Sequence, residues 1–433
     1  MKIGIRREDK SKWERRVPLT PEAVKEIVAQ GIEVYIQPSP IRIYSDQEYI
    51  DAGAEVTEDL SSCPVILAVK EIPIDFFEKG KTYMFFSHTI KGQDYNMPLL
   101  KRMMELEDTL IDYETVTDAE GRRLIFFGRQ AGQAGMIDSL WTLGKRLEWE
   151  GVPNPFSGIK MAHEYSSLDA AKEHIGAIGR ALEKTGLPPV AVPLVVGITG
   201  YGNVSQGAQE ILDLLPVVEI SPSEILKVQA KSKTAGDHIY KIVFKEEDIV
   251  QPLDAGQAFD LQDYYSFPRK YRSSFENYLP YLSMLVNCIY WEDKYPRLVT
   301  KEYLKEAFSA FKAPHLRVIG DISIDIEGSI ECSVKATDSG NPVYVFDPIE
   351  QVTADGWKGF GPVIMAVDNL PCELPREASQ FFSQALTTMI PQLAGADNSR
   401  PLDQSGLPEE LQRAVILKNG KLTDKYTYFE QFL

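Results

Sequence analysis

Two side chains that could exchange protons follow neighbouring apolar stretches near the N-terminus. Lys70 follows the apolar run 65–69, and His88 follows Met84-Phe85-Phe86-Ser87. We expect both runs to be strands of a parallel sheet, whose carboxyl ends line the crevice where ligands bind. Lysine and histidine at one crevice suit general acid–base catalysis, because burial and a cationic neighbour move the pKa of a lysine towards neutrality.

Each of these residues also has a purely structural explanation. A single histidine at a strand end is often a structural residue, and Lys70 beside Glu71 fits a solvated surface pair. Arg15-Arg16, after the first predicted strand, fit an ordinary charged turn. The functional interpretation therefore rests on the joint arrangement of these side chains at one sheet edge, and on none of them alone.

A glycine-rich turn in the middle of the chain joins a predicted strand, 193–198, to a predicted helix. Gly200 and Gly202 fit the first two positions of the dinucleotide-binding pattern, and the small Ser205 stands where the third glycine belongs. Backbone N–H groups of such a turn meet a pyrophosphate at the helix N-terminus. We predict that Gly200, Gly202, Asn203, Val204 and Ser205 bind a nucleotide; the alternative is a tight packing turn.

Ser221 follows the next predicted strand, 217–220, so the position at the strand end carries no carboxylate. Glu219 precedes Ser221 and Glu224 follows it. In NAD sites an acidic residue here holds the ribose 2′-hydroxyl, and it would repel the 2′-phosphate of NADPH. The serine therefore favours NADPH as the cofactor, and NADH stays open because either glutamate could bend in.

The elements that must position these residues alternate between strands and helices. In the first 130 residues, strand patterns at 2–6, 32–36, 64–69, 82–86, 109–113 and 124–127 alternate with helical patterns beginning at Thr20-Pro21 and Met97. A second alternation follows a break at 151–155, with strands expected at 193–198, 217–220, 239–244, 284–290 and 317–322. Such alternation predicts parallel sheets covered by helices. Helices are also expected at about 134–149 and 373–393, and a loop at 397–408.

Composition narrows the classes of function that fit. The net charge of −17 argues against nucleic acid as a partner, because a phosphate backbone demands a basic face. The four cysteines form no C-x-x-C pair, which predicts buried free thiols, and the five histidines lack metal-ligand spacing. No apolar run reaches the ~20 residues of a membrane helix, and the N-terminus enters a strand pattern directly. We therefore expect a cytosolic protein without a metal.

Several blocks of sequence together resemble one enzyme superfamily. They include Arg16-Val-Pro-Leu-Thr-Pro, Val69-Lys70-Glu71-Ile-Pro, Phe86-Ser87-His88 and the segments 6–9, 13–16, 85–91, 111–114, 199–208, 287–292, 320–323 and 368–371. Over residues 1 to about 390 the chain resembles the alanine dehydrogenase and lysine-forming saccharopine dehydrogenase superfamily. Within it, the chain is more similar to the lysine–ketoglutarate reductase domain of the bifunctional aminoadipic semialdehyde synthases of animals and plants.

This resemblance implies an α/β protein of two Rossmann-like domains with parallel sheets and a cleft between them. The first, catalytic domain would be discontinuous, formed by residues 1–135 and 331–433, and the dinucleotide domain would span 136–330. The implied reaction condenses L-lysine with 2-oxoglutarate and reduces the imine to saccharopine with NADPH or NADH. Three substrate carboxylates suit the bidentate fork of arginine.

The resemblance also implies roles for particular residues. The acid–base pair falls on Lys70 and His88, and substrate carboxylates fall to Arg16 and Arg123. Acidic residues that tune this pair and receive the lysine end fall on Glu14 and Glu114. An aspartate near the nicotinamide is either Asp321 or Asp325.

The chain differs from the bifunctional relatives in one respect, and other functions remain as alternatives. The bifunctional relatives continue into a second dehydrogenase, whereas this chain ends at Leu433, so we expect a separate protein to oxidise saccharopine further. Rivals are alanine dehydrogenase, the fungal NAD-linked saccharopine enzyme and a catalytically silent regulatory subunit. Tyr113-Glu114 and the segment 287–292 favour the saccharopine side, and retention of the catalytic set weighs against a silent subunit. The sequence assigns no oligomeric state, and no role to residues after about 395.

Overall fold

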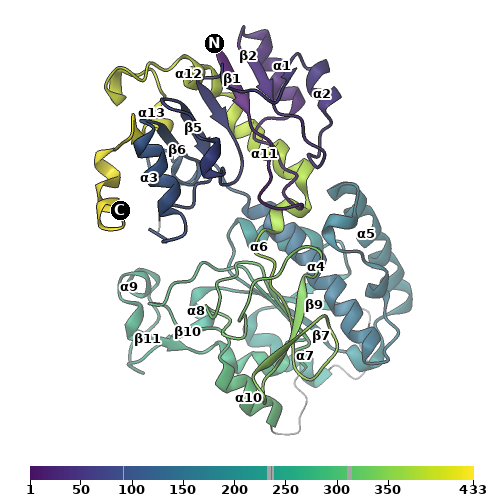
Figure 1. Ribbon diagram of the computed structural model, residues 1–433. Helices are drawn as coiled ribbons and strands as arrows, with labels where there is room; N and C mark the ends of the chain where they lie inside the picture. Colours follow the sequence, from purple (N-terminus) through teal and green to yellow (C-terminus); the bar gives the residue numbers. More distant parts are fainter. Residues whose placement is uncertain (91, 232–235, 237, 310–314) are drawn as a thin grey trace. The chain divides into compact units, whose positions relative to one another are not determined.

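The computed structural model describes residues 1–90, 92–231, 236, 238–309 and 315–433. Lys91, the last residue of the block 85–91, lies outside the described residues. The chain divides into two compact units, shown in Figure 1. Unit 1 comprises Met1–Phe127 and Pro375–Leu433, and unit 2 comprises Gly128–Leu374.

Unit 1 is built on an eight-stranded sheet of order β18-β17-β6-β5-β4-β1-β2-β3. Its strands are β1 (Lys2–Ile5), β2 (Glu33–Ile36), β3 (Glu55–Val56), β4 (Val65–Leu67), β5 (Thr82–Phe85), β6 (Thr109–Asp112), β17 (Val415–Lys418) and β18 (Lys421–Leu422). The strands from β6 to β3 are all parallel, whereas β17 runs antiparallel to both β6 and β18. The carboxyl ends of β1, β4, β5 and β6 therefore meet at one edge.

The helices of unit 1 are α1 (Pro21–Ala29), α2 (Asp46–Asp51), α3 (Met97–Glu105), α11 (Pro375–Thr387), α12 (Ile390–Gly395) and α13 (Glu409–Gln412). Helix α1 starts as its sequence predicts: the Thr20 hydroxyl accepts a hydrogen bond from the amide of Ala23, and Pro21 is the first helical residue. Val24 and Ile27 are buried against the sheet, and Gly31 follows with a φ of 82°.

Unit 2 contains a second eight-stranded sheet, of order β15-β14-β16-β13-β12-β7-β9-β8. Its strands are β7 (Leu194–Thr199), β8 (Val217–Glu219), β9 (Ile239–Phe244), β12 (Met284–Asn287), β13 (Val318–Asp321), β14 (Val343–Asp347), β15 (Val352–Asp355) and β16 (Val363–Met365). Pairing is parallel from β8 to β16 and antiparallel at β14. A separate antiparallel pair joins β10 (Val250–Pro252) and β11 (Tyr271–Ser273).

The helices of unit 2 are α4 (Gly128–Trp149), α5 (Leu168–Thr185), α6 (Asn203–Leu212), α7 (Ile225–Lys231), α8 (Glu246–Ile249), α9 (Leu261–Ser266) and α10 (Lys301–Ser309). α4 is buried along most of its length, against β13, β16 and α6. The α/β class expected for both units is confirmed, with antiparallel edge strands where purely parallel sheets were expected.

Three elements differ from the expectations. Residues 331–374, which we expected in the first domain, lie in unit 2, because β14 and β16 extend its sheet beyond β13. The predicted strand 124–127 is absent, and the preceding residue, Arg123, forms an isolated bridge with Thr117. The predicted helix 373–393 is two helices, since Pro391 provides no N–H for continuing α11. The cleft expected between the domains stays a prediction.

Each unit has its own hydrophobic core, and that of unit 1 draws residues from both of its chain segments. All four cysteines are buried and free, as predicted. Within the described part of the chain, no helix is long and apolar enough to cross a bilayer, and no cluster of His, Cys, Asp and Glu could hold a metal ion.

Candidate active site and nucleotide turn

Lys70 and His88 come together in unit 1, just beyond the carboxyl ends of β4 and β5. Lys70 Nζ lies 3.4 Å from His88 Nε2. Burial and the neighbouring Arg16 lower the pKa of Lys70. Burial and Lys70 lower the pKa of His88 to about 4, so its imidazole is neutral at neutral pH. The two groups therefore form one proton-exchanging pair, whose titration belongs to both.

Glu14 and Arg16 form a buried ion pair in the segment that follows β1. The side chains are 1% and 2% exposed, and Arg16 donates from Nε and Nη2 to the two carboxylate oxygens, at 2.7 and 2.6 Å. The guanidinium also lies over the ring of Phe127, 4.5 Å from its centre. This fork fixes the Arg16 charge close enough to act on the pKa of Lys70.

Glu114 lies between His88 and Arg123. It belongs to the 3₁₀ turn η2 (Tyr113–Thr115), directly after β6. One carboxylate oxygen lies 4.0 Å from His88 Nδ1, and the other lies 3.8 Å from a terminal nitrogen of Arg123. These three side chains are 22–44% exposed, so they face an accessible part of the site. The structure thus brings all six predicted unit 1 residues to one sheet edge.

The glycine turn of unit 2 has the geometry of a phosphate-binding turn. β7 ends at Thr199, Gly200 takes a φ of 82°, and Gly202 precedes α6 as its N-cap without a side-chain cap. A β-carbon at Gly202 would meet only open space, so the backbone is accessible to a ligand. The N-terminal amides of α6, from Asn203 onward, fit a pyrophosphate.

Close packing beside this turn depends on Gly207 rather than on Ser205. Ser205 is buried, and its hydroxyl accepts a hydrogen bond from Gln209 Nε2 at 3.0 Å. A β-carbon at Gly207 would lie 2.1 Å from the carbonyl oxygen of Arg129, at the start of α4. The residue that lets the helices approach is therefore two positions later than the motif suggested.

Glu224 ends the 3₁₀ turn η6 (Pro222–Glu224), which follows β8, and its carboxylate folds back onto Ser221. Its side chain accepts hydrogen bonds from the Ser221 amide and hydroxyl, at 3.0 and 2.8 Å. Glu219 instead pairs with Lys241, at 3.0 Å. A carboxylate thus lies beside Ser221, and the preference for NADPH over NADH stays a prediction.

Asp321 and Asp325 have different environments in unit 2. Asp321 ends β13 and is 1% exposed; it accepts hydrogen bonds from Asn287 Nδ2, at 2.8 Å, and from Ser333 Oγ. Asn287 Oδ1 in turn accepts from the hydroxyl of Thr199, linking the ends of β13, β12 and β7. Asp325 lies in an exposed loop. Which of the two faces the nicotinamide stays a prediction.

Family models match most of unit 1 and part of unit 2. The alanine dehydrogenase/PNT N-terminal domain matches residues 4–134, and the C-terminal domain of the same family matches residues 272–425. The chain belongs to the alanine dehydrogenase/PNT family. Membership of this dehydrogenase family implies a nicotinamide cofactor, which the turn at Gly200–Gly202 fits.

Within the family, similar proteins include two aminoadipic semialdehyde synthases. That of Arabidopsis thaliana is 38% identical over 98% of this chain and 41% of its own length; that of Mus musculus, named as mitochondrial, is 37% identical over 99% and 47%. The chain thus spans less than half the length of these relatives. The saccharopine dehydrogenase [NAD(+), L-lysine-forming] of Yarrowia lipolytica is 27% identical, covering 92% of this chain and 94% of its own. The cytosolic location expected for this chain stays a prediction.

Solved structures of the alanine dehydrogenase/PNT family share the fold. An L-alanine dehydrogenase matches with a TM-score of 0.62 and 18% identity, covering 100% of this chain and 99% of its own. A transhydrogenase from Sinorhizobium meliloti matches with a TM-score of 0.56 and 16% identity, covering 97% and 98%. These likenesses support the architecture of this family member and carry no information about its substrate.

Glu8 contacts the candidate site, although its sequence context alone did not identify it. Its two carboxylate oxygens accept hydrogen bonds from the amides of Val69, at 2.6 Å, and Lys70, at 2.9 Å. Burial and the charge of Glu14 raise the pKa of Glu8 to about 7. The carboxylate therefore ties the segment after β1 to the strand end that carries Lys70. The only sequence signal for Glu8 was its place in the block 6–9, which carries the family resemblance.

Asp112, also missed, joins the segments that carry His88 and Glu114. Its Oδ2 accepts hydrogen bonds from the amide of Ser87, at 3.2 Å, and from the Ser87 hydroxyl; its Oδ1 accepts from the Glu114 amide, at 2.7 Å. Asp112 is fully buried, which raises its pKa to about 7. A charged residue inside an apolar strand pattern was the available signal.

Glu71 belongs to the site rather than to a solvated surface pair with Lys70. Its partner is Lys10, and the hydrogen bond from Lys10 together with His88 lowers the pKa of Glu71 against the effect of burial. In return, the charge of Glu71 raises the pKa of His88 against the larger effects of burial and Lys70. Glu71 therefore tunes the acid–base pair.

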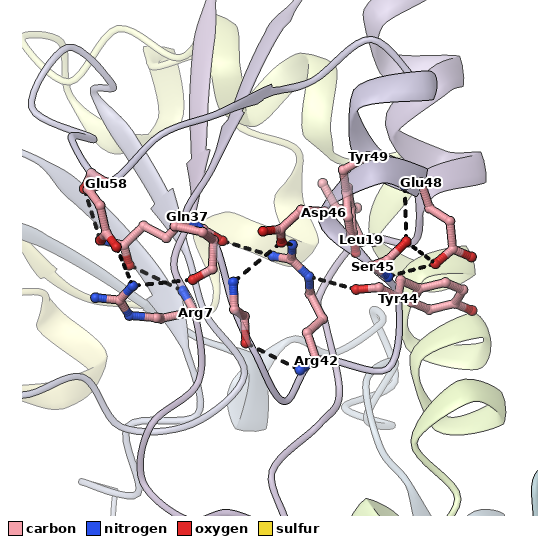
Figure 2. Close-up of polar contacts among 12 residues, drawn as sticks. Arg7, Leu19, Gln37, Arg42, Tyr44, Ser45, Asp46, Glu48, Tyr49 and Glu58 are labelled. Carbon is pink, nitrogen blue, oxygen red and sulfur yellow. Dashed lines mark hydrogen bonds and ion pairs between the residues drawn. The ribbon is translucent and has the colours of Figure 1, made fainter.

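The loop after β2 lies next to the ion pair of Glu14 and Arg16 and is held by hydrogen bonds from Arg42. Figure 2 shows Arg7 bound to Glu58, at 2.7 Å, and Arg42 bound to the carbonyl oxygens of Gln37 and Tyr44, at 2.9 and 3.0 Å. Arg42 and Arg16 line a cavity of about 10 Å³, the size of a single water molecule. Hydrogen bonds within the loop thus occupy Arg42, which we regard as a structural residue.

Proposed function

We propose that the protein makes saccharopine, by condensing L-lysine with 2-oxoglutarate and reducing the imine with a reduced nicotinamide nucleotide. The observation that carries this proposal is the pair of Lys70 and His88 flanked by Arg16, Glu114 and Arg123. Sequence identity of 36–38% to aminoadipic semialdehyde synthases across nearly the whole chain supports lysine over ammonia as the amine.

The coupled pair performs the proton transfers of imine formation. The ε-ammonium of lysine must lose a proton before its nitrogen attacks the keto carbon, and the unprotonated member of the pair accepts that proton. The carbinolamine hydroxyl must then leave as water, and the protonated member donates to it. With a pKa of about 4, His88 is unprotonated at neutral pH and is the member that accepts a proton, whereas Lys70, whose pKa is lowered from its ordinary 10.5, is the member that donates.

The charged groups around the pair orient the substrates. Arg123, whose side chain is 44% exposed, binds a substrate carboxylate, since a guanidinium group matches its geometry. Arg16, which is 2% exposed and forked onto Glu14, instead contributes its positive charge. Glu114 receives the cationic lysine end, because both oxygens of Glu14 are already bonded to Arg16. The nucleotide, held at Gly200, Gly202 and α6 with Ser221 or Glu224 at its ribose, supplies the hydride when bound.

One assay tests the proposal. Purified protein receives NADPH or NADH with L-lysine plus 2-oxoglutarate, or with ammonia plus pyruvate, and nucleotide oxidation is followed by absorbance while saccharopine is identified by mass. We expect oxidation that requires both lysine and 2-oxoglutarate. Oxidation only with ammonia and pyruvate would instead identify an alanine dehydrogenase. Nucleotide binding without oxidation in any mixture would identify a catalytically silent member.

A further inference from the structure

The C-terminal part of the chain, residues 413–432, contacts the segment that carries Glu114. β17 pairs with β6, and the Asp112 amide donates to the carbonyl oxygen of Ala414 at 3.1 Å. The guanidinium of Arg413 donates twice to the carbonyl oxygen of Thr117, at 3.2 and 2.8 Å. The turn η2 is thus held on both sides by residues of this segment.

The same segment contacts the loop that follows His88. The 3₁₀ helix η12 (Asp424–Gln431) presents Tyr428, whose hydroxyl donates to the carbonyl oxygen of Ile90 at 2.9 Å. The ring of Phe432 packs against Gly92, where an added β-carbon would lie only 2.5 Å from the ring. Gly92 has a φ of 64°, so the close approach and the backbone conformation both require glycine. These contacts lie two and four residues after His88.

Tyr428 also lies close to the charge of Glu114. Burial raises the pKa of the Tyr428 hydroxyl, and the charges of Tyr426 and Glu114 add to the effect. The ring is still 42% exposed, and it stacks on Phe429 with ring centres 4.6 Å apart. Tyr426 anchors the helix by donating to the carbonyl oxygen of Arg413 at 3.0 Å. The side chain of Tyr428 is therefore fixed beside both predicted site segments.

We propose that residues 413–432 hold the acid–base histidine and the lysine-binding glutamate in register, with Tyr428 as the main positioning residue. The inference rests on the proposed function, because it takes His88 and Glu114 as site residues. Loops are otherwise the mobile parts of a fold, and a 1 Å misplacement of a site residue is costly in rate. The segment to which the sequence assigned no role thus completes the substrate site.

The test compares Tyr428→Phe, which keeps the ring and removes the donor, with Tyr35→Phe as a matched control. Tyr35 lies in β2 and donates to Glu33, at 3.0 Å, away from the carboxyl ends of β4, β5 and β6. Losing one hydrogen bond should lower kcat/KM for lysine about 3- to 10-fold in Tyr428→Phe. The KM for the nucleotide should not change, and Tyr35→Phe should match the wild type. Phe432→Ala, which removes the second contact, should act in the same direction.

Hydrogen exchange separates this inference from the proposed function. In Tyr428→Phe the amides of residues 87–90 and 113–117 should exchange faster than in the wild type by a similar factor. Unchanged exchange would overturn the positioning role, even if turnover fell. Unchanged kcat/KM together with unchanged exchange would also overturn it. If the wild-type protein did not use lysine, the proposed function would fail, and the exchange rates would still decide whether the segment holds these loops.

Discussion

His88 has a backbone conformation that few residues adopt, with a φ of 52°. A non-glycine residue in the left-handed region costs on the order of 1 kcal/mol. The side-chain amide of Asn96 donates to the His88 carbonyl oxygen at 2.8 Å, and the ring of Phe86 stacks against the imidazole. The surrounding contacts therefore keep a strained conformation that places the imidazole beside Lys70.

Replacing Lys70 should separate catalysis from nucleotide binding. We expect Lys70→Met to lower kcat by at least about 100-fold, because the pair loses one of its two proton-exchanging groups. The dissociation constant of the nucleotide should stay within about twofold, since the turn that fits it lies in unit 2. Steady-state kinetics and nucleotide fluorescence titration measure the two quantities, with the exposed Lys79→Met as control. Equal loss of both would indicate a structural role for Lys70.

Glu224 should govern the choice between the two nucleotides. Its carboxylate accepts hydrogen bonds from the Ser221 amide and hydroxyl, so it would repel a 2′-phosphate if the ribose binds at Ser221 as we propose. Glu224→Gln removes the negative charge, so the ratio of kcat/KM for NADPH to that for NADH should rise several-fold, about 1 kcal/mol in differential binding. The ratio is measured in parallel initial-rate series. An unchanged ratio would place the ribose away from Glu224.

Candidate site residues could be recognised from the sequence only where the neighbouring residues form a pattern. Lys70 and His88 follow apolar runs, and Arg16 lies in a motif that carries the family resemblance. The sequence could therefore suggest all three as site residues. Glu8 and Asp112 act on the backbone of distant strand ends, at sequence separations of 61 and 25 residues. Such contacts follow from strand order, which the local pattern does not specify.

At the scale of elements, buried carboxylates link the strand ends that carry the site. Glu8 links the end of β1 to that of β4, and Asp112 links β5 to β6. Strand order brings these ends together, and the carboxylates fix the irregular segments that follow them. The order β6-β5-β4-β1 is therefore what converts separate motifs into one site.

Asp112→Asn should weaken this linkage in a pH-dependent way. Asparagine keeps one acceptor oxygen, so at pH 5 the variant should be less stable than the wild type by about 1–3 kcal/mol. The folded-state pKa of Asp112 is about 7, against an ordinary 3.8, so the wild type loses stability as pH rises from about 4 to about 7. The variant does not titrate there, and the difference in unfolding free energy should shrink towards pH 8.

Denaturant unfolding at pH 5 and pH 8 measures this difference, with the exposed Asp75→Asn as control. A difference that grows with pH would mean that Asp112 is ionised in the folded protein throughout the range. Turnover should fall in the same variant, because the Ser87 and Glu114 amides lose an acceptor.

Sequence periodicity predicted most strands of both sheets and failed at irregular positions. The run 124–127 is apolar enough for a strand, but it packs as coil: Ile125 is buried, and Leu124 and Phe127 lie against the unit 1 core. An apolar run of four residues is too short for its pattern to distinguish a buried strand from a buried coil. Pro391, by contrast, was a visible signal that the predicted helix 373–393 is interrupted and forms two helices, α11 and α12.

At the scale of the molecule, the boundary near residue 330 was placed too early. The pattern does change there, but the change marks antiparallel strands rather than a return to unit 1. β15 is an edge strand with mostly exposed side chains, so its sequence lacks the apolar run of a buried parallel strand. The chain re-enters unit 1 only at Pro375.

Two buried acids lie near the points where the chain passes between units. Asp138 is in α4, which starts at Gly128, and Glu373 ends the 3₁₀ turn η10 (Leu370–Glu373), just before Pro375. Burial raises the pKa of Asp138 to about 6, and burial with the charge of Asp138 raises the pKa of Glu373 well above its ordinary value. Because both pKa values are raised, the folded protein binds a proton at this pair more readily than the unfolded chain does.

Removing one acid of this pair should stabilise the protein at high pH. Both folded-state pKa values lie above the unfolded ones, so the folded state binds more protons and the wild type loses stability as pH rises from about 4 through about 6. Glu373→Gln keeps a hydrogen-bonding side chain that needs no proton. Its unfolding free energy relative to the wild type should rise by on the order of 1–3 kcal/mol between pH 5 and pH 8.

Calorimetric unfolding at both pH values measures this, with the exposed Glu173→Gln in α5 as control. A relative stability that does not vary with pH would show that the pair ionises without cost. The predicted rise would mean that the link between α4 and η10, through which the chain joins its two units, depends on a retained proton.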